Sequence, residues 1–182
     1  MNTHLVRLVE GLTETLDDRL APYGATPSEH VFLCLRELGA ADRACAAVSH
    51  GDLAAGQPPL RQSSDVAYDV LESARVLFGL ASRLRARATA QHLSSAGMPL
   101  SDALQLLARQ VDEPVEVADA HLVVGQAARV LARASDMAAA CDAGTDAPGL
   151  REALLVIADE LTEYAVLPLV RLAAGVQEAA DE

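Results

Sequence analysis

The sequence predicts an all-α protein, an antiparallel bundle of five to six helices of which three are long. Three observations support this prediction. Alanine and leucine, the residues with the highest helix propensities, dominate the composition, and only 3% of the 182 residues are aromatic. Apolar residues recur at intervals of three and four along most of the chain. Proline and glycine divide the chain into segments joined by turns, and long helices connected in this way pack side by side. We expect residues 1–182 to form a single domain.

The first three helices are expected at residues 3–21, 27–50 and 63–95. The first has leucines at helical spacing and ends at a Pro-Tyr-Gly sequence. The second follows the sequence TPSE, in which Thr26 and Glu29 have the spacing of a capping box and the proline occupies the first helical position. A glycine ends it, and the Gly- and Pro-rich stretch GDLAAGQPPL separates it from the third helix.

Three further helices are expected at residues 100–111, 113–142 and 150–178. The first of these is short, and the second is expected to contain a proline in its first turn. In the third, Pro168 lies well inside the helix, where it has no N–H to offer the carbonyl group of Tyr164. We therefore expect the last helix to bend near Pro168, and bends of this kind often shape a pocket.

His121 is expected to point into the core, unlike the other charged and polar residues of its helix. Most of them share one stripe, consisting of Glu116, Asp119, Gln126, Arg129, Arg133 and Asp136. His121 lies about 200° from Asp119, on the same face as Val124 and Leu131. A half-buried histidine needs hydrogen-bond partners. We interpret it as a hydrogen-bonded core histidine, and the alternative is a role in ligand binding or proton transfer.

Other residues complete two sets of candidates. Arg85 and His92 lie one heptad apart near the border of an apolar face, and Tyr164 lies beside the proline bend, so that His121, Arg85, His92 and Tyr164 are the candidate catalytic residues. The sixth helix has an acidic patch of Glu152, Asp159, Glu160 and Glu163. We interpret this patch and the stripe that contains Glu116 and Asp119 as solvated surface, and the alternative is metal binding, for which the candidate metal ligands are Glu116, Asp119, Glu160 and Glu163. The three cysteines form no Cys-x-x-Cys pair, and we interpret them as small apolar core residues.

Charge and hydropathy limit the partners of this protein. Its net charge of −12 disfavours binding to nucleic acid or to an anionic membrane surface. The first twenty residues lack the pattern of a secretion signal, and no apolar stretch is long enough to span a membrane, so we expect a cytoplasmic protein. All fourteen basic residues are arginine, which is typical of a GC-rich bacterial genome. The slightly positive mean hydropathy predicts a homodimer formed through a long helix.

Two short segments are similar to parts of known families. The sequence AHLVVGQAA at 120–128 resembles the phosphorylated helix of histidine-phosphotransfer domains, which are four-helix bundles. His121 and Gly125 match that helix, but Val124 stands where the family has a lysine. The sequence EVAD at 116–119 is similar to half of the magnesium site of MazG-like nucleotide pyrophosphatases, which are all-helical enzymes. That resemblance implies Mg²⁺ as a cofactor, although the upstream Glu-x-x-Glu of the family is missing here.

Two classes of function follow from these observations. The favoured hypothesis is a non-catalytic interaction or regulatory protein whose bundle surface recognises another protein. The alternative is an enzyme or small-molecule binder built in the bundle, similar to a MazG-like pyrophosphatase or a histidine-phosphotransfer domain.

Overall fold

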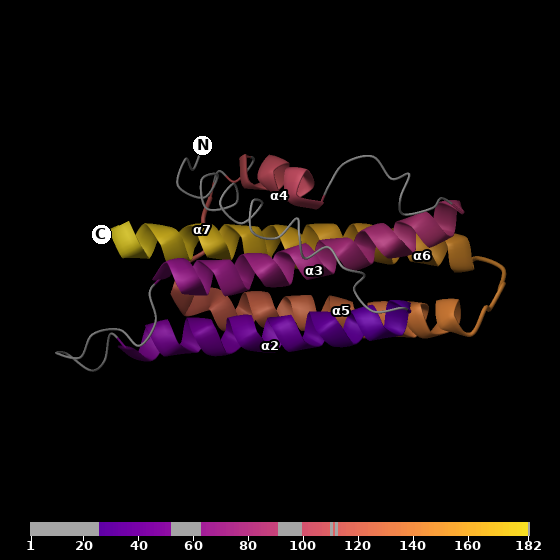
Figure 1. The fold of residues 1–182 in the computed structure, drawn as a ribbon, viewed down its shortest axis with the longest axis horizontal. Helices are drawn as coiled ribbons and strands as arrows, with labels where there is room; N and C mark the ends of the chain where they lie inside the picture. Colours follow the sequence, from indigo (N-terminus) through magenta and orange to yellow (C-terminus); the bar gives the residue numbers. More distant parts are fainter. Residues whose placement is uncertain (1–25, 52–62, 91–99, 110, 112, 182) are drawn as a thin grey trace.

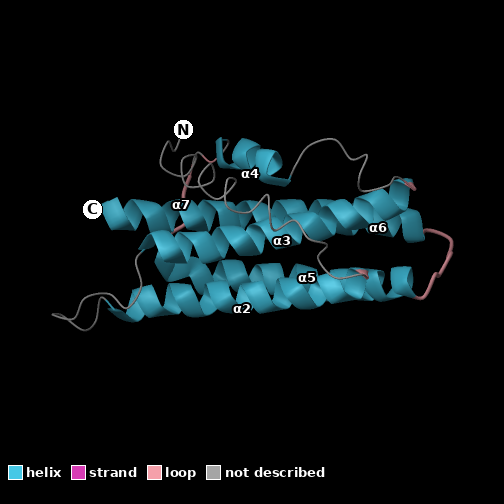
Figure 2. Cartoon of the chain, in the orientation of Figure 1, coloured by secondary structure: helices cyan, strands magenta, loops and turns pink. Residues whose placement is uncertain are grey.

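The computed structural model confirms the all-α prediction (Figures 1 and 2). The structure describes residues 26–51, 63–90, 100–109, 111 and 113–181, and these contain no strand. The helices are α2 (Pro27–Gly51), α3 (Ser63–Thr89), α4 (Leu100–Arg109), α5 (Ala120–Asp142), α6 (Leu150–Leu161) and α7 (Leu167–Asp181), with a 3₁₀ turn η3 (Val117–Asp119) and a π-helical turn η4 (Thr162–Val166). The helix expected at residues 3–21 lies outside the described residues.

Four long rods make up the bundle, because α6, η4 and α7 follow one another as one rod. Helix α2 packs against α3 and α5, and the α6–α7 rod also packs against both of these helices. Neighbouring rods run in opposite directions (Figure 1). Since the long connection through α4 returns the chain to the other end of the bundle, α3 and α5 run in the same direction. The short helix α4 lies outside, against α3 and α7.

The core consists of leucine, valine and alanine. Its largest fully buried side chains include six leucines from three of the four rods, Leu71, Leu77, Leu80, Leu131, Leu161 and Leu169, and alanines such as Ala74, Ala127, Ala134 and Ala158 are completely buried between them. Small side chains let helix backbones approach closely, and the leucines then fill the remaining space. Core packing of this kind requires no aromatic side chain, which explains how a chain so poor in aromatic residues folds into a bundle.

The capping box predicted for the second helix is present at the start of α2. The Glu29 backbone N–H donates to Thr26 Oγ1, and the Thr26 N–H donates to Glu29 Oε2, both at 3.2 Å. The side chain of Arg83 on α3 donates to the Thr26 carbonyl oxygen at 2.9 Å. This contact fixes the start of α2 against α3.

The fifth helix begins later than the sequence predicts, at Ala120 instead of residue 113. The backbone N–H of Val115 donates to the carbonyl oxygen of Arg171 on α7 at 3.1 Å, so this segment crosses α7 before the helix starts. The crossing takes place over Gly175, where an added Cβ would overlap the Val115 carbonyl group. This tertiary contact, and not the local helix signal of the proline in the segment, sets where the helix begins.

The proline of the last helix produces a π-helical turn. Helix α6 ends at Leu161, and in the following turn the backbone N–H of Leu167 donates to the carbonyl oxygen of Thr162, five residues earlier. Pro168 comes directly after this N–H. The wider turn accommodates a residue that cannot donate the regular helical hydrogen bond. The position of the interruption was therefore predicted correctly, and its geometry is that of a π turn.

Candidate functional site

The prediction that His121 points into the core is wrong, because its side chain is exposed. Its Nδ1 lies 3.2 Å from the carbonyl oxygen of Ala118 in the preceding 3₁₀ turn. The buried residues of α5 are Ala120, Val123, Ala127, Val130, Leu131, Ala134 and Ala138. At 100° per residue, His121 lies about 120° from the centre of that face. The histidine therefore belongs to the solvated surface at the first turn of α5.

The candidate metal ligands are not brought together. Glu116, Asp119 and Glu163 are exposed, and Glu160 of α6 forms an ion pair with Arg133 of α5 at 2.8 Å. Within the described ranges, no group of three or more His, Cys, Asp or Glu side chains lies close enough to hold a metal ion. The stripe to which Glu116 and Asp119 belong is largely exposed, with only Gln126 partly buried. The interpretation of this stripe as solvated surface is confirmed for its exposed residues.

The remaining candidate catalytic residues do not meet His121. Arg85, near the end of α3, donates to Asp159 of α6 at 2.6 Å in an exposed ion pair. The end of α3 and the start of α5 lie at opposite ends of the bundle (Figure 1). Tyr164 is 46% exposed on the π turn. His92 lies outside the described residues. The candidate side chains that the structure describes thus provide no shared site for catalysis.

A buried histidine, His30, was not predicted from the sequence. His30 on α2 is 1% exposed, and its Nε2 lies 2.9 Å from the carbonyl oxygen of Val76 on α3. Burial lowers its pKa to about 4, and the nearby Arg83 and Arg75 act in the same direction, so the ring is neutral near pH 7. The sequence contains a signal for this position, because His30 lies four residues before the buried Cys34, on the apolar face of α2.

A buried ion pair lies close to this histidine along α3. The side chain of Arg75 is 7% exposed, and it donates from Nε at 2.7 Å and from Nη2 at 2.5 Å to the two carboxylate oxygens of Glu72. This bidentate geometry compensates part of the cost of burying both charges. His30, Glu72 and Arg75 form a polar layer that joins α2 to α3. Neither of the two hollows described below is lined by His30, Glu72 or Arg75.

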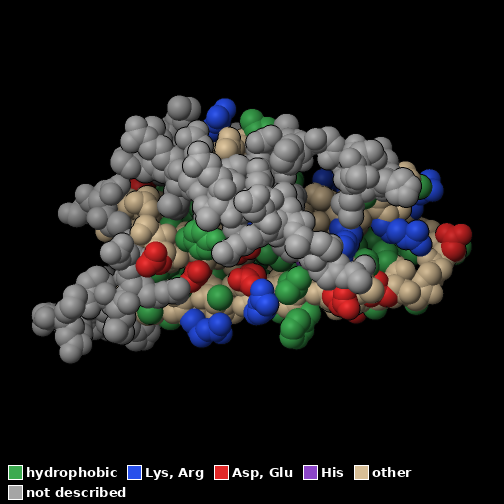
Figure 3. Space-filling view, viewed as in Figure 1, with side chains coloured by type: hydrophobic (Ala, Val, Ile, Leu, Met, Phe, Trp, Pro, Cys, Tyr) green, Lys and Arg blue, Asp and Glu red, His purple; other side chains and the backbone are tan. Residues whose placement is uncertain are grey.

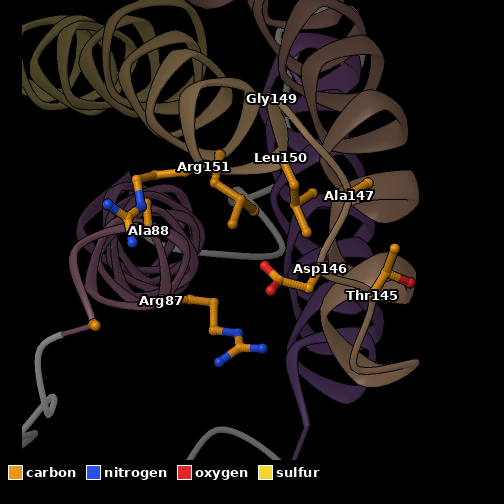
Figure 4. A pocket seen from close by; sticks show the side chains of 10 residues that line it. Arg87, Ala88, Thr145, Asp146, Ala147, Gly149, Leu150 and Arg151 are labelled. Carbon is orange, nitrogen blue, oxygen red and sulfur yellow. The ribbon is translucent and has the colours of Figure 1, made fainter.

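Two hollows are found near the ends of the bundle. One, of about 200 Å³, lies between the end of α3 and the start of α6, and Arg87, Arg151 and Asp146 contribute its charged groups (Figure 4). The side chains of Arg87 and Asp146 extend from opposite sides into the space between α3 and the loop before α6, whereas Arg151 turns toward Ala88 of α3 (Figure 4). The other hollow, of about 480 Å³, follows the crossing of residues 114–118 over α7.

An apolar surface remains on the outside of α2. We call it the α2 outer face and define it by Glu29, Phe32, Leu35, Arg36, Gly39 and Arg43. Phe32 is 69% exposed and Leu35 is 50% exposed. Hydrophobic side chains accordingly appear between charged ones over α2 along the lower edge of the molecule (Figure 3). The arginine at 36 bonds to the neighbouring Glu37 at 2.6 and 2.8 Å.

In the part of the chain that the structure describes, no helix combines the length and apolarity needed to cross a bilayer. Comparison of the sequence with known protein families and with characterised proteins, and of the fold with solved structures, found no match.

Proposed function

We propose that this protein is a non-catalytic interaction or regulatory protein that recognises another protein through the α2 outer face. The observation on which the proposal depends is the exposure of Phe32 and Leu35, one helical turn apart on the same helix. The chain has only two phenylalanines, and one of them is the most exposed large hydrophobic side chain among the described residues. A core-forming role does not explain this placement, whereas binding surfaces are enriched in aromatic side chains and in arginine.

The neighbouring side chains of the α2 outer face suit such a role. Arginines at positions 36 and 43 lie on the same side of α2 as the two apolar residues, and Gly39, which has no side chain, leaves a depression between the arginines. An apolar centre with a charged rim is the usual composition of a protein interface. The proposal includes a homodimer, and it places the protein in the cytoplasm, since its three free cysteines suit a reducing compartment.

Site-specific photocrosslinking in the cells that produce the protein tests this function. A photoreactive residue in place of Phe32 is expected to capture a defined protein, which mass spectrometry then identifies. The matched control carries the same residue in place of Arg129, which is exposed on α5. Capture must disappear when Leu35→Asp is added to the Phe32 probe. If the two probes capture the same proteins, or neither captures any, the α2 outer face is not a recognition surface.

A second candidate function is phosphoryl transfer through His121, as the resemblance to histidine-phosphotransfer domains implies. Its exposure on a helix of a four-rod bundle supports this candidate. An Nδ1 that donates to the Ala118 carbonyl oxygen leaves the lone pair of Nε2 to accept a phosphoryl group. Val124 provides no cation for that group, which distinguishes the chain from the family.

Incubation with acetyl phosphate tests this candidate. The phosphoryl group would move from the acyl oxygen to Nε2, releasing acetate, and intact-mass spectrometry would show one added phosphoryl group. The adduct is expected to be acid-labile and absent from His121→Gln. An adduct that persists in this variant, or no adduct at all, excludes His121 as the acceptor.

A further inference from the structure

We propose that the partner of the α2 outer face is a second copy of this chain, bound so that the two α2 helices lie antiparallel about a two-fold axis close to Arg36. This inference rests on the proposed function and specifies its partner. The argument depends on the order of residues along the face, on the glycine in it, and on the distribution of charge.

Residues of the α2 outer face follow the spacing of a helix seam. Glu29, Phe32, Arg36, Gly39 and Arg43 succeed one another at intervals of three, four, three and four. At 100° per residue they lie within an arc of about 80°. Intervals of this kind keep one stripe of a helix in contact with a second helix over several turns. This stripe, which we call the seam, is long enough to contact a helix of a partner, whereas a single exposed side chain is not.

The order of these residues along α2 is self-complementary when two copies of the helix pair in opposite directions. In an antiparallel pair with its two-fold axis at Arg36, Glu29 of each copy lies opposite Arg43 of the other, because both are seven residues from the axis. Phe32 lies opposite the turn that contains the small residues Gly39 and Ala40. Each contact occurs twice, as a two-fold interface requires. Each α2 helix thus supplies both the projecting side chain of Phe32 and, at Gly39, the space that receives Phe32 of the other copy.

Nothing in the described residues of one copy explains Gly39. It lies in the middle of α2, where glycine is less favourable than alanine. A Cβ at this position would have only one close neighbour outside its own turn, the Nη1 atom at the flexible end of the Arg43 side chain, at 3.3 Å. A second helix approaching this point would be obstructed by a side chain and admitted by a glycine. The position therefore indicates close approach from outside.

The charges of the seam favour this partner in spite of the net charge of −12. Two copies repel each other through most of their acidic surfaces. The seam contains two arginines and one glutamate, and Arg36 is already paired with Glu37 beside it. Within the described residues, Arg43 is exposed and has no ion-pair partner of its own. The reversed pairing supplies that partner without bringing unpaired like charges together.

Sedimentation equilibrium of the full chain at about 50 µM tests the pairing, since dimer formation depends on concentration. We expect a dimer whose dissociation constant rises about 30-fold or more in Phe32→Asp, the effect of losing a central aromatic contact. Leu122→Asp is the matched control, because Leu122 is 57% exposed on α5, away from the seam, and must leave the dimer intact. Gly39→Leu adds apolar surface to the seam but fills the space opposite Phe32, so it must also weaken the dimer.

Disulfide crosslinking tests the register. Arg36→Cys is made in a Cys141→Ser background, since the two remaining native cysteines, Cys34 and Cys45, are buried. Mild oxidation is expected to give a covalent dimer through the two introduced thiols, one from each copy, which lie near the axis. Ala132→Cys, at an exposed position of α5, is the control and must not crosslink at the same protein concentration.

The outcomes separate this inference from the proposed function. A monomer at about 50 µM, or a dimer unaffected by both Phe32→Asp and Gly39→Leu, overturns the self-pairing. If the Phe32 photoprobe nevertheless captures a different protein, recognition of another protein by the α2 outer face stands, and only self-pairing through this face was wrong. A dimer that depends on Phe32 but is not crosslinked through Arg36→Cys excludes the antiparallel register proposed here.

Discussion

His30 Nε2 and the carbonyl oxygen of Val76 lie 2.9 Å apart and join α2 to α3 inside the core. Because burial holds the ring neutral, this contact couples the packing of two long helices to the protonation of one side chain. It is therefore a point at which pH acts directly on the fold.

The free energy of unfolding is expected to fall as the pH decreases from about 6.5 to about 4. His30 has its ordinary pKa of 6.5 in the unfolded chain and a pKa of about 4 in the folded one, so between these values the unfolded chain binds more protons. The full difference corresponds to about 3 kcal/mol. Urea unfolding at several pH values measures it. His30→Gln keeps a donor for the Val76 carbonyl and does not titrate, so an equally steep pH dependence in this variant would contradict the assignment.

Removal of Glu72 is expected to destabilise the protein by about 3 kcal/mol, because Glu72→Ala leaves the buried guanidinium of Arg75 without its bidentate partner. Asp159→Ala breaks an ion pair of similar length, but Arg85 and Asp159 are 40% and 71% exposed. We expect that variant to lose less than about 1 kcal/mol. Denaturant unfolding of both variants gives the comparison, and equal losses would show that burial does not set the strength of the Glu72 pair.

Two glycines should respond in opposite directions to substitution by alanine. At Gly175 a Cβ would overlap the carbonyl group of Val115, so Gly175→Ala must displace the segment that crosses α7, at a cost of about 2 kcal/mol or more. At Gly125, inside α5, a Cβ meets nothing within 4 Å, and Gly125→Ala should stabilise the protein by about 0.5–1 kcal/mol. Thermal unfolding distinguishes the two. Stabilisation by both variants would mean that residue 115 does not pack on α7.

The three thiols are expected to react at different rates in the folded protein. Burial raises the pKa of all three, for Cys45 to about 11, so little thiolate exists near pH 8. Cys141 alone is partly accessible. A chromogenic disulfide reagent should therefore label one thiol slowly in the native protein and all three in denaturant. Rapid labelling of a second thiol that persists in Cys141→Ser would indicate that the α2 core opens.

The fold was predictable because its determinants are local. Thr26 and Glu29 specify a capping box whatever surrounds them, and both hydrogen bonds of that box are formed. The start of the fifth helix was not predictable, because it is set by the contact of Val115 with Arg171, far away in the sequence. The π turn was predictable only in part. Pro168 indicates that the helix is interrupted, but it does not indicate which hydrogen bonds replace the regular ones.

The histidines show why buried polar groups were harder to predict than the bundle. The predicted face of α5 includes Val124 and Leu131, whereas the buried residues are Ala120, Val123, Ala127, Val130, Leu131, Ala134 and Ala138. Alanine occurs on every side of such helices, so its positions do not identify the buried face. The predicted face was therefore rotated, and His121 was placed inside. His30 was overlooked although it shares the face of Cys34, because its partner is a backbone carbonyl, which leaves no pattern in the sequence.

The π turn Thr162–Val166 has a consequence for how the chain tolerates changes in length. The hydrogen bond of a π turn joins residues five apart instead of four, so the turn contains one residue more than a regular α-helical turn. Without that extra residue, the α6–α7 rod would be a regular helix with the same faces directed at its neighbours. Deleting one residue there, together with replacing Pro168, would give an uninterrupted helix with both halves still facing α3. The same deletion in Leu150–Leu161 would turn everything after it by about 100° and expose the buried side of α7.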